Sequence, residues 1–462
     1  VGSPLLIFAY EPRLENHQQK QAPRHSITED LRRLCTPGSR VLYFLYHGDK
    51  IFNNLQKLIS QAYLTDSSPK RNCLKFIFRR YITKMDAIKT AIIGMGNMGS
   101  QYAAYLLSGK VPGMELAAVT RVRPEQLLAL DLALPEDLPV FSSADALFDA
   151  LDAGRIRLDA VIIATPHRLH AEQSIAAMKR GLHVLCDKPA GIYSRQARLM
   201  EESRPGSLVC AYIFHQRTFP SYRRIRQIVH SKILGNLKRV SWTATDWYRS
   251  NAYYQSSSWR GTWKLDGGGT LLNQCPHNLD LLQWICGMPA RVHAFCHNGK
   301  YHPIEVEDEA TAYMEWDDGA SGVFIASTGE APGVNRLEIA LDNGLIICQP
   351  DSVKISRLDR PEKEYRALPG TGFEQPDASQ EEMPMETDPD AYLTILNNFA
   401  SAAARGDTQN LIAPWEEGRK SLLLSNAIYL SSWTGKTIDL PIPGSADEKI
   451  FEKEFEEHWS KM

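Results

Sequence analysis

The chain has 462 residues, of which 43% are hydrophobic and 23% charged, as in a globular protein of two or three domains. Its formal net charge is -2, but residues 1–84 carry 14 Lys/Arg and 6 Asp/Glu, so the chain from residue 85 onward is acidic. An acidic body argues against nucleic-acid binding, and no apolar run reaches the ~20 residues of a membrane helix. We therefore expect neither a nucleic acid nor a membrane as partner.

None of the eight cysteines belongs to a CxxC pair, and most lie in apolar runs. Buried free thiols are the favoured interpretation, with disulfides or a metal site as the alternative. Free thiols indicate a reducing compartment. We therefore expect a cytoplasmic protein with no bound metal.

Residues 1–84 contain apolar clusters but no sustained helical or strand period. They lack the basic start and cleavage site of a signal peptide, and acids such as Glu11 and Glu15 are atypical of a transit peptide. Met85 stands just before the first predicted strand. We interpret residues 1–84 as an upstream extension, non-functional or disordered, with a small regulatory appendage as the alternative.

Strand and helix signals alternate over residues 85–206. This rhythm predicts a Rossmann domain, a doubly wound parallel sheet that binds ligands at the carboxyl ends of its strands. The predicted strands cover residues 88–93, 115–120, 159–164 and 182–186, and the predicted helices 97–108 and 168–180.

A glycine-rich loop joins the first strand to the first helix. It reads Gly94-Met95-Gly96-Asn97-Met98-Gly99, a G-x-G-x-x-G pattern. The first glycine allows a tight turn, the second lets a pyrophosphate approach the backbone, and the third lets the helix pack against the strand. Strand before and helix after favour a dinucleotide site; the alternative is a tight turn with no ligand.

The end of the second strand bears on the choice of coenzyme. NAD-binding folds place Asp or Glu there to hold the ribose 2′-hydroxyl. This chain has Thr120 and Arg121, and no carboxylate before Glu125. A cation and a hydroxyl suit a 2′-phosphate, so we expect NADP. The alternative is that Arg121 and Arg123 are solvated and that NAD binds without a carboxylate.

Two further strands end in polar groups. One end reads Ala164-Thr165-Pro166-His167, with His170 one turn on, and the other reads Cys186-Asp187-Lys188-Pro189. A lysine after a buried strand can hydrogen-bond a substrate hydroxyl and stabilise negative charge as the proton leaves. The alternatives are a surface lysine in a loop, and capping roles for the two histidines.

Residues 207–443 have a different pattern. Asp-Gly and Asn-Gly turns at 317–319 and 342–344 separate alternating runs, which predicts hairpins. We expect an α+β substrate domain with an open, largely antiparallel sheet, whose free face pairs subunits into a homodimer or homotetramer. We also expect a solvated loop at 374–390 and a helix at 416–433 that ties the domains together. In the tail, 444–462, we expect an amphipathic helix over residues 447–461 with Ile450, Phe451 and Phe455 on one side.

The densest chemistry lies between residues 247 and 280. A Gly267-Gly268-Gly269 run leads to Asn273 and His277, which share a face if they lie on one helix. The amide suits substrate orientation, and the imidazole has the pKa range of a general acid or base near neutral pH. The alternative is a core histidine. Aromatic residues including Tyr248 and Trp259 suit a sugar-stacking wall as well as they suit packing.

Together these motifs resemble the glucose–fructose oxidoreductase / inositol dehydrogenase (Gfo/Idh/MocA) family, over about residues 88–441. The resemblance implies a nicotinamide cofactor and sugar or polyol substrates. Lys188 falls on the lysine of the family's Glu-Lys-Pro motif and His277 on its catalytic histidine. The resemblance implies that Lys188 binds the reacting hydroxyl and that His277 moves the proton of this hydroxyl. It further implies that a hydride passes between the carbinol carbon and nicotinamide C4.

The sequence departs from the family pattern at three positions. Asp187 replaces the usual Glu, Arg121 replaces the usual acid, and Asn273 stands where many members have Asp. Since an amide cannot take a proton, His277 must carry that duty alone or with Lys188.

The expected function is that of an NADP-preferring dehydrogenase or reductase of a sugar, glycoside or cyclitol. Alternatives are a glycosidase- or epimerase-like enzyme that cycles a tightly bound NAD, and a non-catalytic sugar or nucleotide sensor. The expected catalytic residues are Lys188, Asn273 and His277. The expected substrate-binding residues are these three together with Tyr248 and Trp259. Arg260 is expected to bind the cofactor because its segment resembles a family segment that approaches the nicotinamide. The full set of expected cofactor-binding residues is Gly94, Met95, Gly96, Asn97, Met98, Gly99, Thr120, Arg121, Ala164, Thr165, Pro166, His170, Asp187, Lys188 and Arg260.

Overall fold

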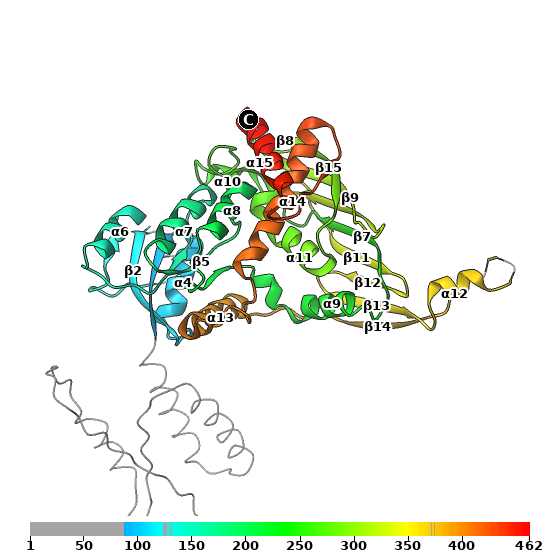
Figure 1. Cartoon of the computed structure of the whole chain (residues 1–462), viewed down its shortest axis with the longest axis horizontal. Coiled ribbons are helices and arrows are strands. Elements are labelled where there is room, and N and C mark those ends of the chain that lie inside the picture. Colours follow the sequence, from blue (N-terminus) through cyan, green and yellow to red (C-terminus); the bar gives the residue numbers. More distant parts are fainter. Residues whose placement is uncertain (1–86, 123–126, 129, 131, 371, 374) are drawn as a thin grey trace, which may run out of the picture. The chain divides into compact units, whose positions relative to one another are not determined.

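The computed structural model describes residues 87–122, 127, 128, 130, 132–370, 372, 373 and 375–462, without the side chains of Arg121 and Val122. The predictions for residues 1–84 and for Arg123 lie outside this part. The described residues form one compact unit. It contains two sheets, with helices packed on and between them (Figure 1).

The first sheet is parallel and, within the described residues, six-stranded, in the order β3-β2-β1-β4-β5-β6. The strand order reverses between β1 and β4, which opens a crevice at their carboxyl ends. This confirms the predicted doubly wound sheet. β6 lies beyond residue 206, the predicted end of the first domain. The strands are β1 Ile88–Met95, β2 Met114–Val122, β3 Val140–Phe141, β4 Ala160–Ile163, β5 His183–Cys186 and β6 Cys210–Tyr212.

Helices cover both faces of this sheet (Figure 1). On one face, α6 (Ala144–Asp152), α7 (His170–Met178) and α8 (Ser194–Glu202) share an apolar cluster with the strands. On the other face lie α4 (Asn97–Leu107) and α13 (Ala391–Arg405). α13 comes from the C-terminal part of the chain, so the Rossmann sheet is completed by a segment that the sequence did not assign to it.

The second sheet has nine strands within the described residues, in the order β14-β13-β12-β11-β7-β10-β9-β8-β15. Its pairs are antiparallel except β7 with β10. This confirms the predicted open, largely antiparallel sheet and the two hairpins. The strands are β7 Leu237–Ala244, β8 Arg291–Asn298, β9 Glu307–Glu315, β10 Ser321–Ser327, β11 Asn335–Leu341, β12 Gly344–Cys348, β13 Ser352–Leu358, β14 Ala378–Pro384 and β15 Ile438–Asp439.

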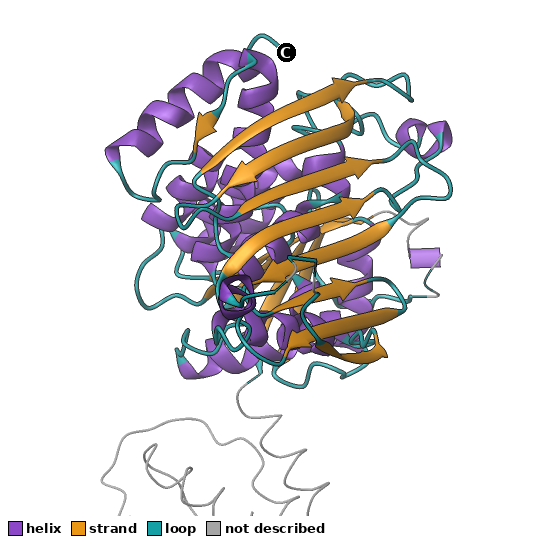
Figure 2. Cartoon of the chain, turned by 90° about the vertical axis from the view of Figure 1, so that its right-hand side faces the viewer, coloured by secondary structure: helices purple, strands orange, loops and turns teal. Residues whose placement is uncertain are grey.

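One face of the second sheet packs on helices, and the strands of the opposite face are in full view in Figure 2. The long α14 (Trp415–Thr434) lies between the sheets, with Leu422 in the apolar cluster of the first and Leu423 in that of the second. It therefore ties the domains together as predicted. The other helices of this layer are α9 Pro220–His230, α11 Pro276–Cys286 and α15 Ala446–Trp459.

Two local predictions were wrong. The expected loop at 374–390 contains the edge strand β14, whose side chains are nearly all exposed and therefore lack the alternation that marks a half-buried strand. In the C-terminal helix, Phe451 and Phe455 are buried, but Ile450 is 65% exposed because its neighbour Phe451 occupies the inward stripe. The four described cysteines at 186, 210, 275 and 348 are buried free thiols, and Cys286 and Cys296 are free and half-buried. No described helix is long and apolar enough to cross a membrane.

Candidate active site

The glycine-rich loop opens toward the N-terminus of α4. Gly94 has φ +97°, and a Cβ there would lie 2.7 Å from the Ala164 carbonyl oxygen. A Cβ at Gly99 would lie 1.9 Å from the Gly94 oxygen, so both positions need glycine. A Cβ at Gly96 would meet nothing within 4 Å, and the first turn of α4 has no acid. Open space at the backbone of a helix N-terminus fits a pyrophosphate.

Thr120 holds this loop in place. Its hydroxyl is buried and accepts a hydrogen bond from the Gly94 N–H at 3.1 Å. The hydroxyl thus supports the tight turn after β1 and keeps its own O–H as a donor. Arg121 is the next residue of β2, and its side chain lies outside the described part. Met95, Asn97 and Met98 complete the loop and begin α4.

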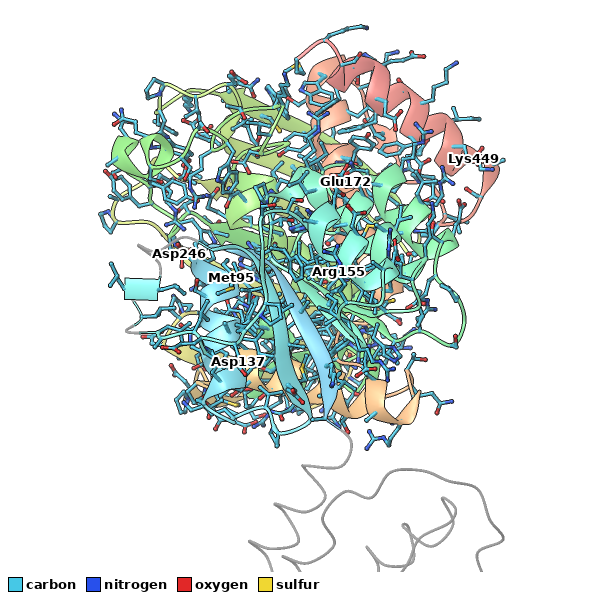
Figure 3. The ribbon with its side chains drawn as sticks, turned by 90° about the vertical axis from the view of Figure 1, so that its left-hand side faces the viewer. Met95, Asp137, Arg155, Glu172, Asp246 and Lys449 are labelled. Carbon is cyan, nitrogen blue, oxygen red and sulfur yellow. The ribbon has the colours of Figure 1, made fainter. Side chains whose placement is uncertain are left out.

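A cavity of about 350 Å³ lies beside the loop, at the carboxyl ends of β1, β2 and β4. Figure 3 shows the strands of this sheet, with Met95 at the end of β1 and Glu172 on α7. The position is where a doubly wound sheet holds the adenosine half of a dinucleotide. The lining residues are Ile93, Thr120, Ser143, Ala144, Asp145, Phe148, Thr165, Leu169, Glu172, Gln173 and Ala176.

His170 joins the ends of β4 and β5. Its Nδ1 lies 2.8 Å from the Pro189 carbonyl oxygen and its Nε2 2.8 Å from that of Thr165. Burial lowers the pKa of His170 to about 4, so the imidazole is neutral near pH 7. The ring thus fixes the two loops after these strands, including the turn at Ala164 and Pro166.

Asp187 is buried and anchors the backbone that carries Lys188. Its carboxylate accepts hydrogen bonds from the Tyr102 hydroxyl at 3.1 Å and from the Lys188 N–H at 2.8 Å. Burial raises the pKa of Asp187, an effect that the charge of Lys188 opposes. The acid therefore orients the lysine through its main chain.

Lys188 reaches from the first domain to the second. Its Nζ donates a hydrogen bond to the Asn273 carbonyl oxygen at 3.1 Å. Burial lowers the pKa of Lys188 below its usual 10.5, while Asp187 and Asp266 act in the opposite direction. The ammonium group is therefore held at the junction of the two domains, where a substrate oxygen can replace or share this contact.

Asn273 and His277 do not share one helix, contrary to expectation. Asn273 lies in a π-helical turn, Thr270–Gln274, and His277 lies in α11, which begins at Pro276. Proline has no N–H to continue the first helix, but it fits the first turn of a new one. The break points the two side chains differently around Lys188.

A buried glutamate supports the π-helical turn. Glu307 accepts hydrogen bonds from the N–H groups of Gly269 and Leu271, both at 2.8 Å, and from the Tyr429 hydroxyl at 2.8 Å. A Cβ at Gly269 would lie 1.8 Å from the Glu307 carbonyl oxygen. The glycine run therefore lets the turn approach β9 closely.

Asp266 sets the orientation of the Asn273 amide. The Asn273 Nδ2 donates to both carboxylate oxygens, at 3.0 and 3.1 Å, and Oδ1 lies 3.4 Å from the Tyr253 hydroxyl. Asp266 also accepts from the Gly261 N–H at 3.1 Å and lies 3.3 Å from His167 Nδ1. The sequence prediction missed this residue, although an acid directly before the Gly267 run was a visible signal.

His277 is 5% exposed, and its Nδ1 has no hydrogen-bond partner among the described residues. The ring of His215 stands edge-on at 4.4 Å between centroids and itself stacks on Tyr392 at 4.3 Å. Burial lowers the pKa of His277 well below 6.5, and the charges of His215 and Lys188 lower it further. A neutral imidazole beside the ammonium group can accept a proton. Nothing in the sequence pointed to His215.

The aromatic residues are only partly brought together. Trp259 packs edge-on against His167 at 5.6 Å. The Arg260 guanidinium lies 4.5 Å from the Trp259 ring centroid, and its NH1 donates to the Tyr253 hydroxyl at 2.5 Å. Tyr248 is 52% exposed, at the outer side of this segment. Among the residues that the structure describes, no group of three His, Cys, Asp or Glu could hold a metal ion.

Two domains of one protein family match this chain. Residues 88–203 match the oxidoreductase family with an NAD-binding Rossmann fold, and residues 222–347 match the GFO/IDH/MocA C-terminal domain. The first match covers β1 to β5 of the parallel sheet with the glycine loop, and the second covers α9 to β12 of the second domain.

Curated relatives are similar at the level of distant homologues. D-glucoside 3-dehydrogenase of Escherichia coli is 28% identical over 51% of this chain and 64% of its own length. 1,5-Anhydro-D-fructose reductase of Ensifer adhaerens is 28% identical over 36% of this chain and 50% of its own. The NADP(+)-dependent D-xylose 1-dehydrogenase 2 of Haloferax volcanii is 25% identical over 61% of this chain and 81% of its own length. The chain thus spans about half to two-thirds of the first two relatives.

Solved structures share the fold. The WlbA dehydrogenase from Bordetella pertussis, in complex with NADH and UDP-GlcNAcA, has a TM-score of 0.61 at 24% identity, over 77% of this chain and 99% of that one. Levoglucosan dehydrogenase, in complex with NADH and levoglucosan, has a TM-score of 0.60 at 19% identity, over 77% of this chain and 100% of that one. With the glycine loop, the Lys188 strand end and both domain matches in place, the chain belongs to the Gfo/Idh/MocA family of oxidoreductases.

Proposed function

We propose that the protein is an NAD(P)-dependent oxidoreductase that transfers a hydride between nicotinamide and a carbinol or ketone carbon of a sugar, glycoside or cyclitol. The observation that carries the proposal is the contact of Lys188 Nζ with the Asn273 carbonyl, beside the buried imidazole of His277. The relatives named as glucoside dehydrogenase, anhydrofructose reductase and xylose dehydrogenase support a sugar as substrate.

A dinucleotide would bind with its pyrophosphate at Gly96 and α4 and its adenosine in the cavity lined by Thr165, and it would supply the hydride acceptor. In the oxidation, Lys188 donates a hydrogen bond to the substrate oxygen and stabilises its developing negative charge. Neutral His277 takes the hydroxyl proton. The C–H electron pair leaves the carbinol carbon as hydride while the C=O bond forms, and the reduction reverses each step.

Asn273 orients the substrate and carries no proton. Its Nδ2 is bound to Asp266, which leaves Oδ1, near the Tyr253 hydroxyl, as the acceptor for a substrate hydroxyl. This arrangement is consistent with His277 as the group that moves the proton. Trp259, against His167, offers an aromatic surface in the same segment as Tyr253.

For the coenzyme we propose NADP in preference to NAD. The basis is Arg121 at the end of β2, in a stretch without a carboxylate from residue 119 to 124. Two acids in the cavity, Asp145 and Glu172, act against a 2′-phosphate, so Arg121 must supply the selectivity.

We further propose a cytoplasmic homo-oligomer that pairs through the uncovered face of the second sheet. Phe295 is 60% and Tyr313 45% exposed on neighbouring strands β8 and β9 of this face (Figure 2). Exposed aromatic residues on a continuous sheet surface favour a subunit interface. The buried thiols support a reducing compartment.

The test is turnover of a panel of sugars, glycosides and cyclitols with NADP or NAD, followed at 340 nm. We expect a net absorbance change with some member of the panel and its loss in Lys188→Met and His277→Asn. Product formed with no net absorbance change, together with a co-purifying NAD, would instead indicate an internal redox cycle. Ligand binding without product from any panel member would indicate a sensor.

A further inference from the structure

Two arginines share one tyrosine at the edge of the proposed site. The guanidinium carbons of Arg249 and Arg260 lie 4.9 and 4.3 Å from the ring centroid of Tyr253. The Nε atoms of both arginines are shielded from solvent and have no hydrogen-bond partner among the described residues. Neither guanidinium forms an ion pair with a carboxylate in that part of the chain. Two unpaired cations this close repel each other, so their arrangement favours an anion between or beside them.

These cations adjoin the reacting groups. The Tyr253 hydroxyl, which receives NH1 of Arg260, also accepts from Gln274 Nε2 at 3.1 Å and lies 3.4 Å from Asn273 Oδ1. The carbonyl of the same asparagine accepts from Lys188. Arg260 is therefore linked through Tyr253 and Asn273 to the lysine that would hold the substrate oxygen. Arg249 joins this group only through its contact with the Tyr253 ring, and its NH1 donates to the Tyr248 carbonyl oxygen at 2.9 Å.

Arg249 is held rigidly through its backbone. Its N–H donates to the Thr328 carbonyl at 2.9 Å, and its own carbonyl lies 2.8 Å from His302 Nε2. His302 Nδ1 lies 3.0 Å from the buried carboxylate of Asp308, which also accepts from the Tyr301 N–H at 2.8 Å. A side chain on such a fixed base loses less entropy on binding a ligand.

The neighbouring carboxylates are held by other donors. Asp266 is bound to the Asn273 amide and the Gly261 N–H, and Asp246 accepts from Asn335 Nδ2 at 3.1 Å. Position 273 carries an amide where many family members have an acid, which removes a further negative charge. Neither carboxylate is therefore placed as the ion-pair partner of Arg249 or Arg260.

We propose that Arg249 and Arg260 form a subsite for an anionic substituent of the substrate, a carboxylate or a phosphate, so that the protein acts on sugar acids or sugar phosphates in preference to neutral sugars. This gives Arg260 a role toward the substrate in place of the coenzyme contact that the family resemblance implies. The inference rests on the proposed function, since it names the substrate class of that site. A guanidinium presents N–H donors in a planar fork that matches the oxygens of both anions. Both arginines are half-buried beside aromatic rings, which reduces the competition from water for such contacts.

The test is equilibrium binding followed by intrinsic tryptophan fluorescence, with NADP present, for three probes: methyl glucoside, methyl glucuronide and glucose 6-phosphate. We expect at least one anionic probe to bind about 10-fold or more tightly than the neutral glucoside, a difference of about 1.4 kcal/mol. Arg249→Gln should reduce this ratio by about 10-fold and Arg249→Lys by less, since lysine keeps the charge. Arg155→Gln is the matched control, because Arg155 is an exposed arginine of the first domain, labelled in Figure 3.

Equal or absent binding of all three probes by the native protein would overturn the subsite. So would a ratio unchanged by Arg249→Gln, or a loss of NADP affinity as large as the loss of anion affinity, which would assign the arginine to the coenzyme. The tighter of the two anionic probes identifies the group. Because the readout is binding, preferential anion binding without turnover of any sugar would contradict the proposed reaction while leaving the subsite in place.

Discussion

The ring of His215 stands edge-on to that of His277, at an interplanar angle of 80°. Burial keeps the pKa of His277 well below 6.5 and lowers that of His215 to about 4. The proton acceptor of the oxidation is therefore already deprotonated at neutral pH. We expect kcat/KM for the oxidation to stay high as the pH falls through 6.5 and to decline only below it. At high pH the decline should start below 10.5, where Lys188 loses its proton. A pH–rate profile of kcat/KM measures both declines, the acid limb at low pH and the alkaline limb at high pH.

The variant His215→Phe tests the pairing of the two rings. It keeps an aromatic ring against Tyr392 but removes one group whose charge lowers the pKa of His277. The acid limb should move to higher pH while coenzyme affinity stays the same. An acid limb in the variant that coincides with the native one would show that His215 only fills space.

Lys188→Met should remove catalysis without removing the coenzyme site. The substitution keeps a long apolar stem but deletes the ammonium group that donates to Asn273. We expect kcat to fall by about 10²–10⁴-fold, the usual range for a positioned proton donor or acceptor. NADP binding, measured by fluorescence, reports whether the Rossmann domain is intact. Activity within a few-fold of the native protein would rule out the assigned role.

Arg121→Gln should change the coenzyme preference. Removing the charge at the end of β2 deprives a 2′-phosphate of its partner, and a hydrogen bond to a charged group contributes about 1.5–3 kcal/mol. The ratio of kcat/KM for NADP to that for NAD should therefore fall by about 10- to 100-fold. The affinity for NAD should hold or improve. If the two coenzymes are used equally before and after the change, Arg121 does not select between them.

Arg217→Met should destabilise the fold strongly. Arg217 is buried and contacts both oxygens of buried Asp280, at 2.8 and 2.6 Å. Removing the cation leaves a buried carboxylate without its partner, which costs about 3–5 kcal/mol of unfolding free energy. Urea unfolding measures the loss. Arg366→Met, in an exposed pair with Glu362, should cost about 0–1 kcal/mol. Similar losses in the two variants would contradict the role of the buried pair.

Phe295→Glu should separate subunits if they pair through the uncovered sheet face. A carboxylate on β8 would have to be desolvated in that interface. Sedimentation velocity should show a smaller species than the native protein forms. Ile442→Glu, at an exposed position outside the strands, is the control. A native protein that sediments as a monomer would remove the basis for this interface.

Much of the fold could be predicted because its signals are local. The period of the strands, the Gly94–Gly99 loop and the Asp-Gly and Asn-Gly turns each depend on a few neighbouring residues, and the sheets follow from them. β14 was missed because an edge strand exposed on both faces has no hydrophobic period. The place of α13 on the Rossmann sheet was missed because its apolar stripe fits any buried surface.

The site was predictable only where a motif marks it. Lys188 and His277 lie at recognisable positions of the sequence. His215 contacts His277, far along the chain, and no spacing rule connects the two. Asp266 was marked only by its place before the Gly267 run, and neither its contact with the Asn273 amide nor that of Tyr253 could be read from the sequence. The break between Asn273 and His277 could have been predicted from Pro276, since proline interrupts a continuous helix.

Within the described part of the chain, the nine-stranded sheet has two open edges, and each is unsuited to recruiting a further strand. At one end, β14 has the sequence Ala-Ser-Gln-Glu-Glu-Met-Pro, with two adjacent exposed glutamates and a terminal proline. At the other, β15 is two residues long and carries an exposed aspartate. Like charges and a missing N–H donor discourage a second molecule from extending the ladder into a fibril. Edge-to-edge pairing is thereby disfavoured, which leaves the broad face of the sheet as the surface for the proposed association.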